Sequence, residues 1–225
     1  MKIASLKPTQ WFPGQNVSVK PHLRGWIHLV AAPLSLAASI VLTCLAPTGA
    51  TKGGSAIYLA ASLILFGISA LYHRFYWSPR WEVVWNRLDH SNIFLLIAGT
   101  YTPLSIAILP HDQAVTILAI VWGGALLGIL LNLFWSTAPR WLATLIYVAL
   151  GWVALWYLPQ FWSLGGAVIV WLLLAGGILY TIGAVVYATK KPDLSPRWFG
   201  FHEIFHLCTV LAWACHCVAV YLAVL

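Results

Sequence analysis

Seven long apolar segments constrain the fold of this chain more than any other feature. They lie at about 26–46, 55–76, 89–109, 114–135, 141–158, 163–188 and 200–225, and Gly, Pro or a charged residue falls in almost every gap. A helix needs about 20 apolar residues to cross the hydrocarbon core of a bilayer. We therefore expect an all-α membrane protein with seven transmembrane helices.

The low content of charged residues excludes a soluble enzyme. Charged residues make up 8% of the 225 residues and apolar residues 61%, whereas a soluble domain carries about 25% charged residues. The formal net charge is +7, but the basic residues lie between apolar segments and form no basic domain. We therefore expect membrane lipids as partners and no nucleic acid.

The distribution of basic residues predicts the orientation in the membrane. If the amino terminus lies in the cytosol, the inner segments hold every Lys and Arg residue except Lys52. Cytosolic loops of membrane proteins carry an excess of Lys and Arg. We therefore expect residues 1–25 to form a cytosolic amino-terminal tail, residues 26–225 to form the seven-helix domain, and the carboxyl terminus to lie outside.

A Pro-Arg-Trp tripeptide occurs three times, at 79–81, 139–141 and 196–198. Pro suits the first turn of a helix, while Arg and Trp favour the interface between membrane and water. We interpret each tripeptide as the opening of the segment that leads into the third, fifth or seventh helix on the inner side. Ser78 and Ser195 precede two of them and are expected helix N-caps.

Ionisable side chains are costly inside a membrane and mark candidate functional sites. The predicted topology places His73 in the last inner turns of the second helix, with Ser69 one turn deeper. Asp89 lies at the inner start of the third helix, and His202 and His206 lie in the first turns of the seventh. Three segments that are distant in sequence thus bring five polar residues to one depth.

These residue types favour a zinc site. His202 and His206 are four residues apart and lie on one helix face, a spacing at which two imidazoles can bind one Zn²⁺. His73 would complete a three-histidine set with an open position for water, which is the arrangement of a catalytic zinc site. Asp89 and Ser69 could then hold that water or orient a ligand.

The same residues resemble those of a known family. The sequences Ser-Ala-Leu-Tyr-His at 69–73 and His-Glu-Ile-Phe-His at 202–206, with Asp89 between them, closely resemble the hemolysin III family. That family belongs with the progestin and adipoQ receptors and, more distantly, the alkaline ceramidases. The segments 71–75 and 99–103 look like the bacterial branch.

The resemblance covers the chain from about residue 23 onward. It implies seven helices with a cytosolic amino terminus in the bacterial cytoplasmic membrane. It also implies zinc held by His73, His202 and His206, with Asp89 and Ser69 contacting the zinc-bound water.

Other interpretations of individual residues stay open. His202-Glu203-x-x-His206 also matches the zincin protease signature, in which the Glu is the general base, although the Gly and third His of the extended signature are absent. Otherwise we expect Glu203 to pair with Arg197 or Lys191 near the lipid headgroups. His28 could support the site or lie at the interface. His90 points about 100° away from Asp89 and is expected outside the site.

His216 lies some 15 Å deeper than His206 along the helix axis. It is therefore expected to bond a neighbouring helix rather than the same ion. The spacing Gly124-x-x-x-Gly128 predicts close helix packing.

Three functions follow from this pattern. The first is a zinc-dependent hydrolase of lipid amide or ester bonds at the cytosolic leaflet, linked to membrane lipid homeostasis, with Asp89 as general base and Ser69 steadying the reacting carbonyl. The second is a zinc-stabilised, receptor-like sensor of membrane lipid state without catalysis. The third is a cytolytic pore, although no predicted helix shows the polar stripe that lines an aqueous channel.

Overall fold

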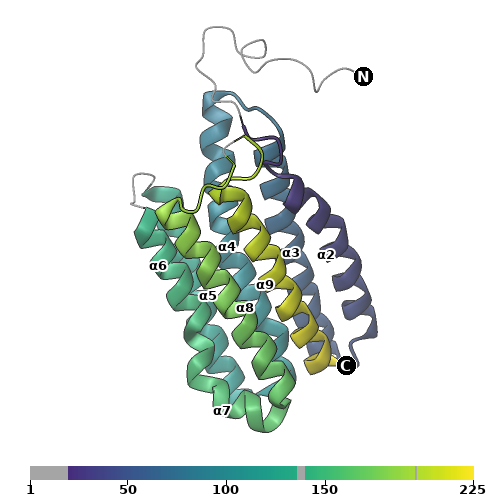
Figure 1. Cartoon of the computed structure of the whole chain (residues 1–225). Helices are drawn as coiled ribbons and strands as arrows, with labels where there is room; N and C mark the ends of the chain where they lie inside the picture. The colour runs from purple at the N-terminus through teal and green to yellow at the C-terminus, as the bar shows by residue number, and fades with distance from the viewer. Residues whose placement is uncertain (1–19, 136–139, 196) are drawn as a thin grey trace.

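The computed structural model describes residues 20–135, 140–195 and 197–225, which form a helical bundle (Figure 1). The helices are α2 (Trp26–Leu45), α3 (Gly49–Arg74), α4 (Pro79–Ile108), α5 (His111–Phe134), α6 (Arg140–Gly151), η2 (Trp152–Tyr157), α7 (Leu158–Gln160), η3 (Phe161–Gly165), α8 (Ala167–Thr189) and α9 (Phe201–Val224).

Within the described part of the chain, seven helical segments are long and apolar enough to cross a membrane. Six are single helices, and the segment 141–165 combines α6, η2, α7 and η3. The predicted seven-helix membrane fold is therefore confirmed.

Successive helices of the chain form a closed ring, in which the last helix also contacts the first. Each of α2, α3, α4, α5, α6, α8 and α9 packs against its neighbour in this order, and α9 also packs against α2 and α4. In Figure 1, α9 accordingly lies beside α8, with α3 and α4 behind it. The last helix therefore contacts the first helices of the chain, and residues distant in sequence can meet in the bundle.

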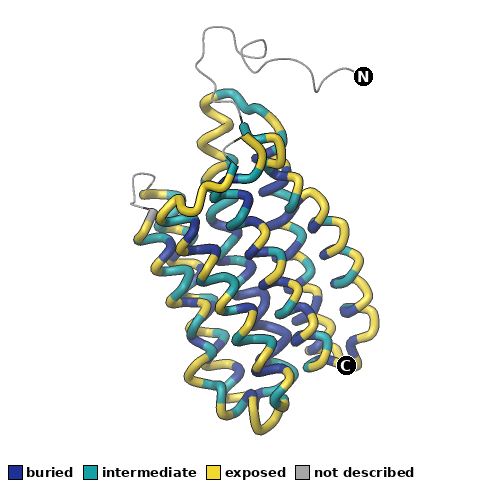
Figure 2. Tube along the Cα trace, in the orientation of Figure 1, coloured by how far each residue is buried: buried dark blue, intermediate teal, exposed yellow. Residues whose placement is uncertain are grey.

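Burial follows the pattern expected of a bundle in lipid. Buried positions face the interior, and the outward turns are largely exposed (Figure 2). The exposed side chains include large apolar residues, for example Leu34, Phe134 and Trp171. A bilayer is the solvent that accepts such a surface, since helices satisfy their backbone hydrogen bonds internally.

Two helices begin earlier than the apolar segments suggest. α3 begins at Gly49, where Thr48 and Thr51 form a capping box. α4 begins at Pro79, ten residues before the predicted crossing. Pro79 occupies the first turn of the helix, a position that favours proline. The residues between Pro79 and Asp89 are more polar, but they continue the same helix beyond the apolar segment.

The fifth crossing is longer and less regular than predicted. α6 ends at Gly151, and the chain continues through short 3₁₀, α and π turns to Gly165. Gly166 then has φ of +90°, a backbone conformation that favours glycine. The sixth crossing therefore begins at Ala167 rather than at 163.

The Pro-Arg-Trp tripeptides have different outcomes. At 79–81 the prediction of a helix start is confirmed, with Ser78 as N-cap residue. At the last copy the segment leads into α9, which begins at Phe201 after Gly200, so the expected N-cap role of Ser195 is wrong. Ser195 instead pairs with Phe199 in a turn. Residue 139 of the second copy and residue 196 of the last copy lie outside the described residues.

We call the end of the bundle where α2, α4 and α9 begin the amino-terminal end. Residues 20–25 are described there, and they form a turn packed against the ends of α3 and α9. These six residues of the predicted amino-terminal tail therefore pack against the bundle. Residues 1–19 lie outside the described part.

Candidate metal centre

Three histidines meet at the amino-terminal end of the bundle. His73 lies in the last turn of α3, and His202 and His206 lie in the first two turns of α9. One ring nitrogen of each lies within 4.8 Å of the others, which makes the trio a possible metal-binding group. The ring centroids are 4.5–4.9 Å apart. The structure thus brings together the three histidines that the sequence nominates.

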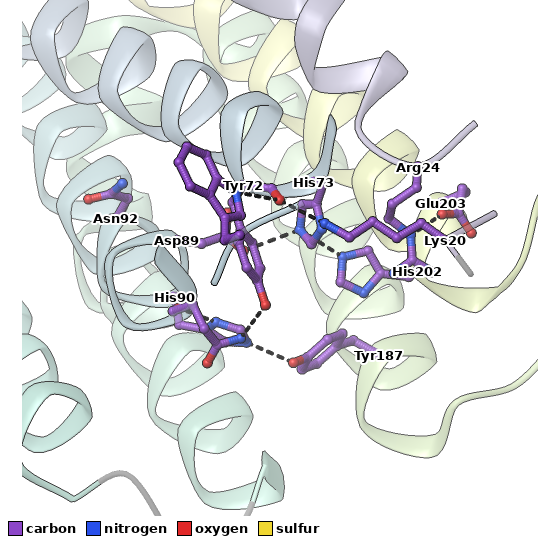
Figure 3. Close-up of polar contacts among 12 residues, drawn as sticks. Lys20, Arg24, Tyr72, His73, Asp89, His90, Asn92, Tyr187, His202 and Glu203 are labelled. Atoms are coloured by element: carbon purple, nitrogen blue, oxygen red, sulfur yellow. Dashed lines mark hydrogen bonds and ion pairs between the residues drawn. The ribbon is translucent and has the colours of Figure 1, made fainter. Parts of the chain in front are cut away.

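The distance between two of these nitrogens fits a tetrahedral zinc ion. Zn–N bonds of about 2.0–2.1 Å at the tetrahedral angle place two ligand nitrogens about 3.3 Å apart. The Nε2 atoms of His73 and His202 are 3.2 Å apart (Figure 3). His73 and His206 are buried, so a bound ion would be shielded from bulk water. Neutral imidazoles are the ligand type that Zn²⁺ prefers.

Asp89 joins this cluster from α4. Its Oδ2 lies 3.4 Å from Nε2 of His73 (Figure 3), and the buried Ser69 hydroxyl, one turn before His73, interacts with the same carboxylate. The structure therefore places all five predicted site residues together. An acidic oxygen and a hydroxyl next to an imidazole cluster can orient a water molecule or a polar ligand.

Hydrogen bonds at the start of α9 fix the position of His202. The Phe201 N–H donates to Oδ1 of Asp193 (3.2 Å), and the Gly200 N–H donates to Oε2 of Glu203 (2.8 Å). The first N–H groups of a helix have no partners within the helix, and acidic side chains satisfy them well. The side chains of Asp193 and Glu203 therefore hold the first turn of α9 in place.

Glu203 has a different partner from the one predicted. Its carboxylate is 1% exposed and forms an ion pair with Arg24, which precedes α2 (Figure 3). Pairing with Arg197 or Lys191 at headgroup level is therefore wrong. A carboxylate that is paired with Arg24 is also poorly placed to act as the general base of a zincin.

The segment 20–25 also holds the end of α3. The ammonium group of Lys20 donates to the carbonyls of Tyr72 (3.0 Å) and Phe75 (2.7 Å), which have no partners within the helix because they lie at its C-terminus. Burial lowers the pKa of Lys20 from 10.5 to about 8. Gly25 has φ of +81°, and a Cβ there would lie 2.9 Å from Cβ of His73. The segment therefore packs directly on a predicted metal ligand.

His28 lies directly against the histidine cluster, a position that the sequence had left open. It is 2% exposed, and its ring stacks on that of His206 with centroids 3.8 Å apart and planes 10° apart. It is therefore a buried residue of the site rather than an interfacial histidine. Sequence reasoning left both possibilities open, because a histidine near the end of a membrane helix suits either.

An elongated cavity of about 130 Å³ begins at Asp89 and His202 and extends along the bundle to Phe161 and His216. Its walls are mainly apolar side chains of α4, α6, α8 and α9. The span from His202 to His216 corresponds to about 20 Å along α9. The candidate metal centre therefore opens into an apolar space inside the bundle.

His90 lines this cavity, although the sequence placed it outside the site. Its Nδ1 bonds the carbonyl of Asn86 (2.8 Å), so this nitrogen carries the hydrogen and Nε2 accepts from the Tyr187 hydroxyl (2.7 Å; Figure 3). The pair links α4 to α8 beside the cluster. The signal that sequence reasoning missed is Tyr187, a polar residue near the inner end of the sixth crossing.

Two further predictions are confirmed. His216 bonds the carbonyl of Leu173 in α8 (3.2 Å) rather than the cluster. A Cβ at Gly124 would lie 2.7 Å from Leu150, and one at Gly128 would lie 2.3 Å from the Phe94 ring. Both glycines therefore permit close helix packing.

Comparisons with known proteins agree with this architecture. The family model described as Haemolysin-III related matches residues 17–217. The chain is 35% identical over 188 residues to Hemolysin-3 of Bacillus cereus, covering 80% of each protein. It is 36% identical over 147 residues to the Hemolysin-3 homolog of Bacillus subtilis (strain 168), covering 64% of this chain and 68% of the relative. With its seven apolar helices, the chain belongs to the haemolysin III family of integral multi-pass membrane proteins.

Proposed function

We propose that this protein is a zinc-dependent hydrolase of lipid amide or ester bonds. It would act at the cytosolic leaflet of the bacterial cytoplasmic membrane and contribute to membrane lipid homeostasis. The observation that carries the proposal is the meeting of three histidines and Asp89 at the head of an apolar cavity within a membrane-spanning bundle.

His73, His202 and His206 would hold the metal through ring nitrogens. A zinc ion bound there supplies a Lewis acid that polarises a carbonyl group and activates water. Asp89 Oδ2 would accept the proton of the attacking water molecule, and the Ser69 hydroxyl would donate a hydrogen bond to the substrate carbonyl oxygen. Hydrolysis adds water across the acyl bond and releases a fatty acid together with an amine or alcohol.

The cavity supports a lipid as the substrate class. Its apolar walls suit an acyl chain, while Asp89 and His202 at one end place polar groups where the amide or ester bond would lie. Ligand sites commonly combine a mostly apolar lining with a few fixed polar groups. A hydrolytic site built inside a bilayer gives long-chain substrates direct access from the membrane.

The experiment is a comparison of wild type and Asp89→Asn in vesicles of total bacterial lipid. Wild type releases free fatty acid, measured by mass spectrometry, and Asp89→Asn loses that release by 10²-fold or more while keeping its zinc and its melting temperature. Asp112→Asn, the same change at an exposed position in the first turn of α5 and outside the cavity, is the matched control and retains the activity of wild type.

Equal fatty acid release from wild type and Asp89→Asn would contradict catalysis. A zinc-containing wild type without release would instead favour the non-catalytic sensor. Leakage of a dye trapped in the same vesicles would favour the pore.

A further inference from the structure

The buried imidazole of His28 is unusual because it lacks hydrogen-bond partners among the described residues. The imidazole is 2% exposed, and neither ring nitrogen has a hydrogen-bond partner among the residues that the structure describes. Leaving a buried donor or acceptor unpaired costs about 1–3 kcal/mol. Buried polar side chains in native proteins are almost always satisfied by protein, water or an ion. The position of His28 therefore points to a polar partner supplied by the site.

The surroundings of the ring restrict where that partner lies. The edge of Phe66 meets the ring with centroids 5.2 Å apart and planes 72° apart, and His206 covers one face. His73 and Asp89 lie close enough to act on His28 electrostatically. Phe66 offers only an apolar contact, whereas the polar groups that act on His28, namely His73, Asp89 and the backbone of His206, all belong to the candidate site.

Direct coordination is not the role that the geometry favours. The group of nitrogens within 4.8 Å of one another consists of His73, His202 and His206. The His28 ring is stacked on the His206 ring with centroids 3.8 Å apart, and its nitrogens do not belong to that group. A buried ring in this position can contact a bound ion through a water molecule that bridges the two.

We propose that His28 is a positioning residue of the metal centre, which hydrogen-bonds a water molecule of the centre and holds the His206 ring by stacking. This inference rests on the proposed zinc site but not on catalysis. Residues that hydrogen-bond the ligands of a metal typically change its affinity 10–100-fold when they are mutated. His28 is therefore expected to contribute to metal affinity without being a ligand.

The test measures zinc affinity by competition with a chelator in the purified full-length protein, together with the visible absorption spectrum of the Co²⁺-substituted form. His28→Phe preserves the stacked ring and removes both nitrogens, and it weakens zinc binding 10–100-fold with an altered Co²⁺ spectrum. His28→Gln restores a donor and an acceptor and binds zinc more tightly than His28→Phe. His216→Phe, a histidine-to-phenylalanine change outside the cluster, binds zinc within twofold of wild type.

Each outcome decides the inference. Zinc affinity of His28→Phe within twofold of wild type, with an unchanged Co²⁺ spectrum, overturns it. An equal loss in His216→Phe also overturns it, because the effect would then be one of general packing. If His28→Phe does not fold, His28→Leu takes its place in the comparison with His28→Gln. A wild type that binds no zinc overturns the proposed metal centre as well, so the two failures are distinguishable.

Discussion

Replacing Arg24 by Met tests the ion pair that ties the amino-terminal segment to α9. The Glu203 side chain is 1% exposed and the Arg24 side chain 20%. Removing one partner of a buried ion pair costs about 3–5 kcal/mol, because the remaining charge stays buried. Arg24 is partly exposed and Glu203 keeps its bond from the Gly200 N–H, so we expect the lower end, about 3 kcal/mol.

The assay is thermal unfolding in a mild detergent. For a chain of this length, about 1 kcal/mol shifts the melting temperature by about 2–4 °C, so Arg24→Met is expected to melt about 6–12 °C below wild type. Zinc affinity should fall with it, since Glu203 is adjacent to His202. The double variant Arg24→Met, Glu203→Leu recovers most of the loss, because apolar replacement of a buried pair is often neutral.

Arg197→Met is the matched control. Arg197 is exposed at the same end of the bundle, and an exposed charge contributes at most about 1 kcal/mol. A melting temperature of Arg24→Met equal to that of Arg197→Met, or a double variant no more stable than Arg24→Met, would refute the reasoning.

Three further predictions concern backbone packing and the buried lysine, each measured by thermal unfolding in detergent. Gly25→Ala places a Cβ in a left-handed conformation 2.9 Å from Cβ of His73 and destabilises the fold by about 1–2 kcal/mol or more; an unchanged melting temperature would contradict this packing. Gly128→Ala forces a Cβ against an aromatic ring of α4 and costs about 1–3 kcal/mol, whereas Gly123→Ala, with open space around its Cβ, costs less than 1 kcal/mol. Since burial lowers the pKa of Lys20 from 10.5 to about 8, the unfolded chain binds more protons between these values and stability rises with pH there; Lys20→Met should lack this rise, and equal slopes for both proteins would count against it.

Much of the fold was predictable because lipid imposes a simple rule on the sequence. Each crossing must supply about 20 apolar residues, and the seven apolar segments correspond to the seven observed crossings. The helix ends were less predictable. Local hydrogen bonds decide them, as at Thr48, and a helix such as α4 continues beyond the apolar segment, where hydropathy gives no signal.

The meeting of the five candidate residues was predictable from depth and helical spacing together. The topology sets the depth of His73 and Asp89, and the four-residue spacing of His202 and His206 sets their common face. Their meeting in the structure follows from the packing of α4 against both α3 and α9.

The partners of those residues were not predictable. Arg24 and Glu203 are separated by 179 positions, and sequence reasoning favoured basic residues nearer in the chain. The stacking of His28 on His206 depends on contact between the first and last crossings. Tertiary packing determines such contacts, and neither hydropathy nor local spacing encodes them.

The most direct test of the proposed metal centre is the zinc content of the purified protein. Elemental analysis of wild type, after removal of loosely bound metal, should give one zinc ion per chain. Single Ala variants of His73, His202 and His206 should each lose most of it, while His216→Ala retains it. Wild type without zinc, or a His206→Ala variant with undiminished zinc, would contradict the account.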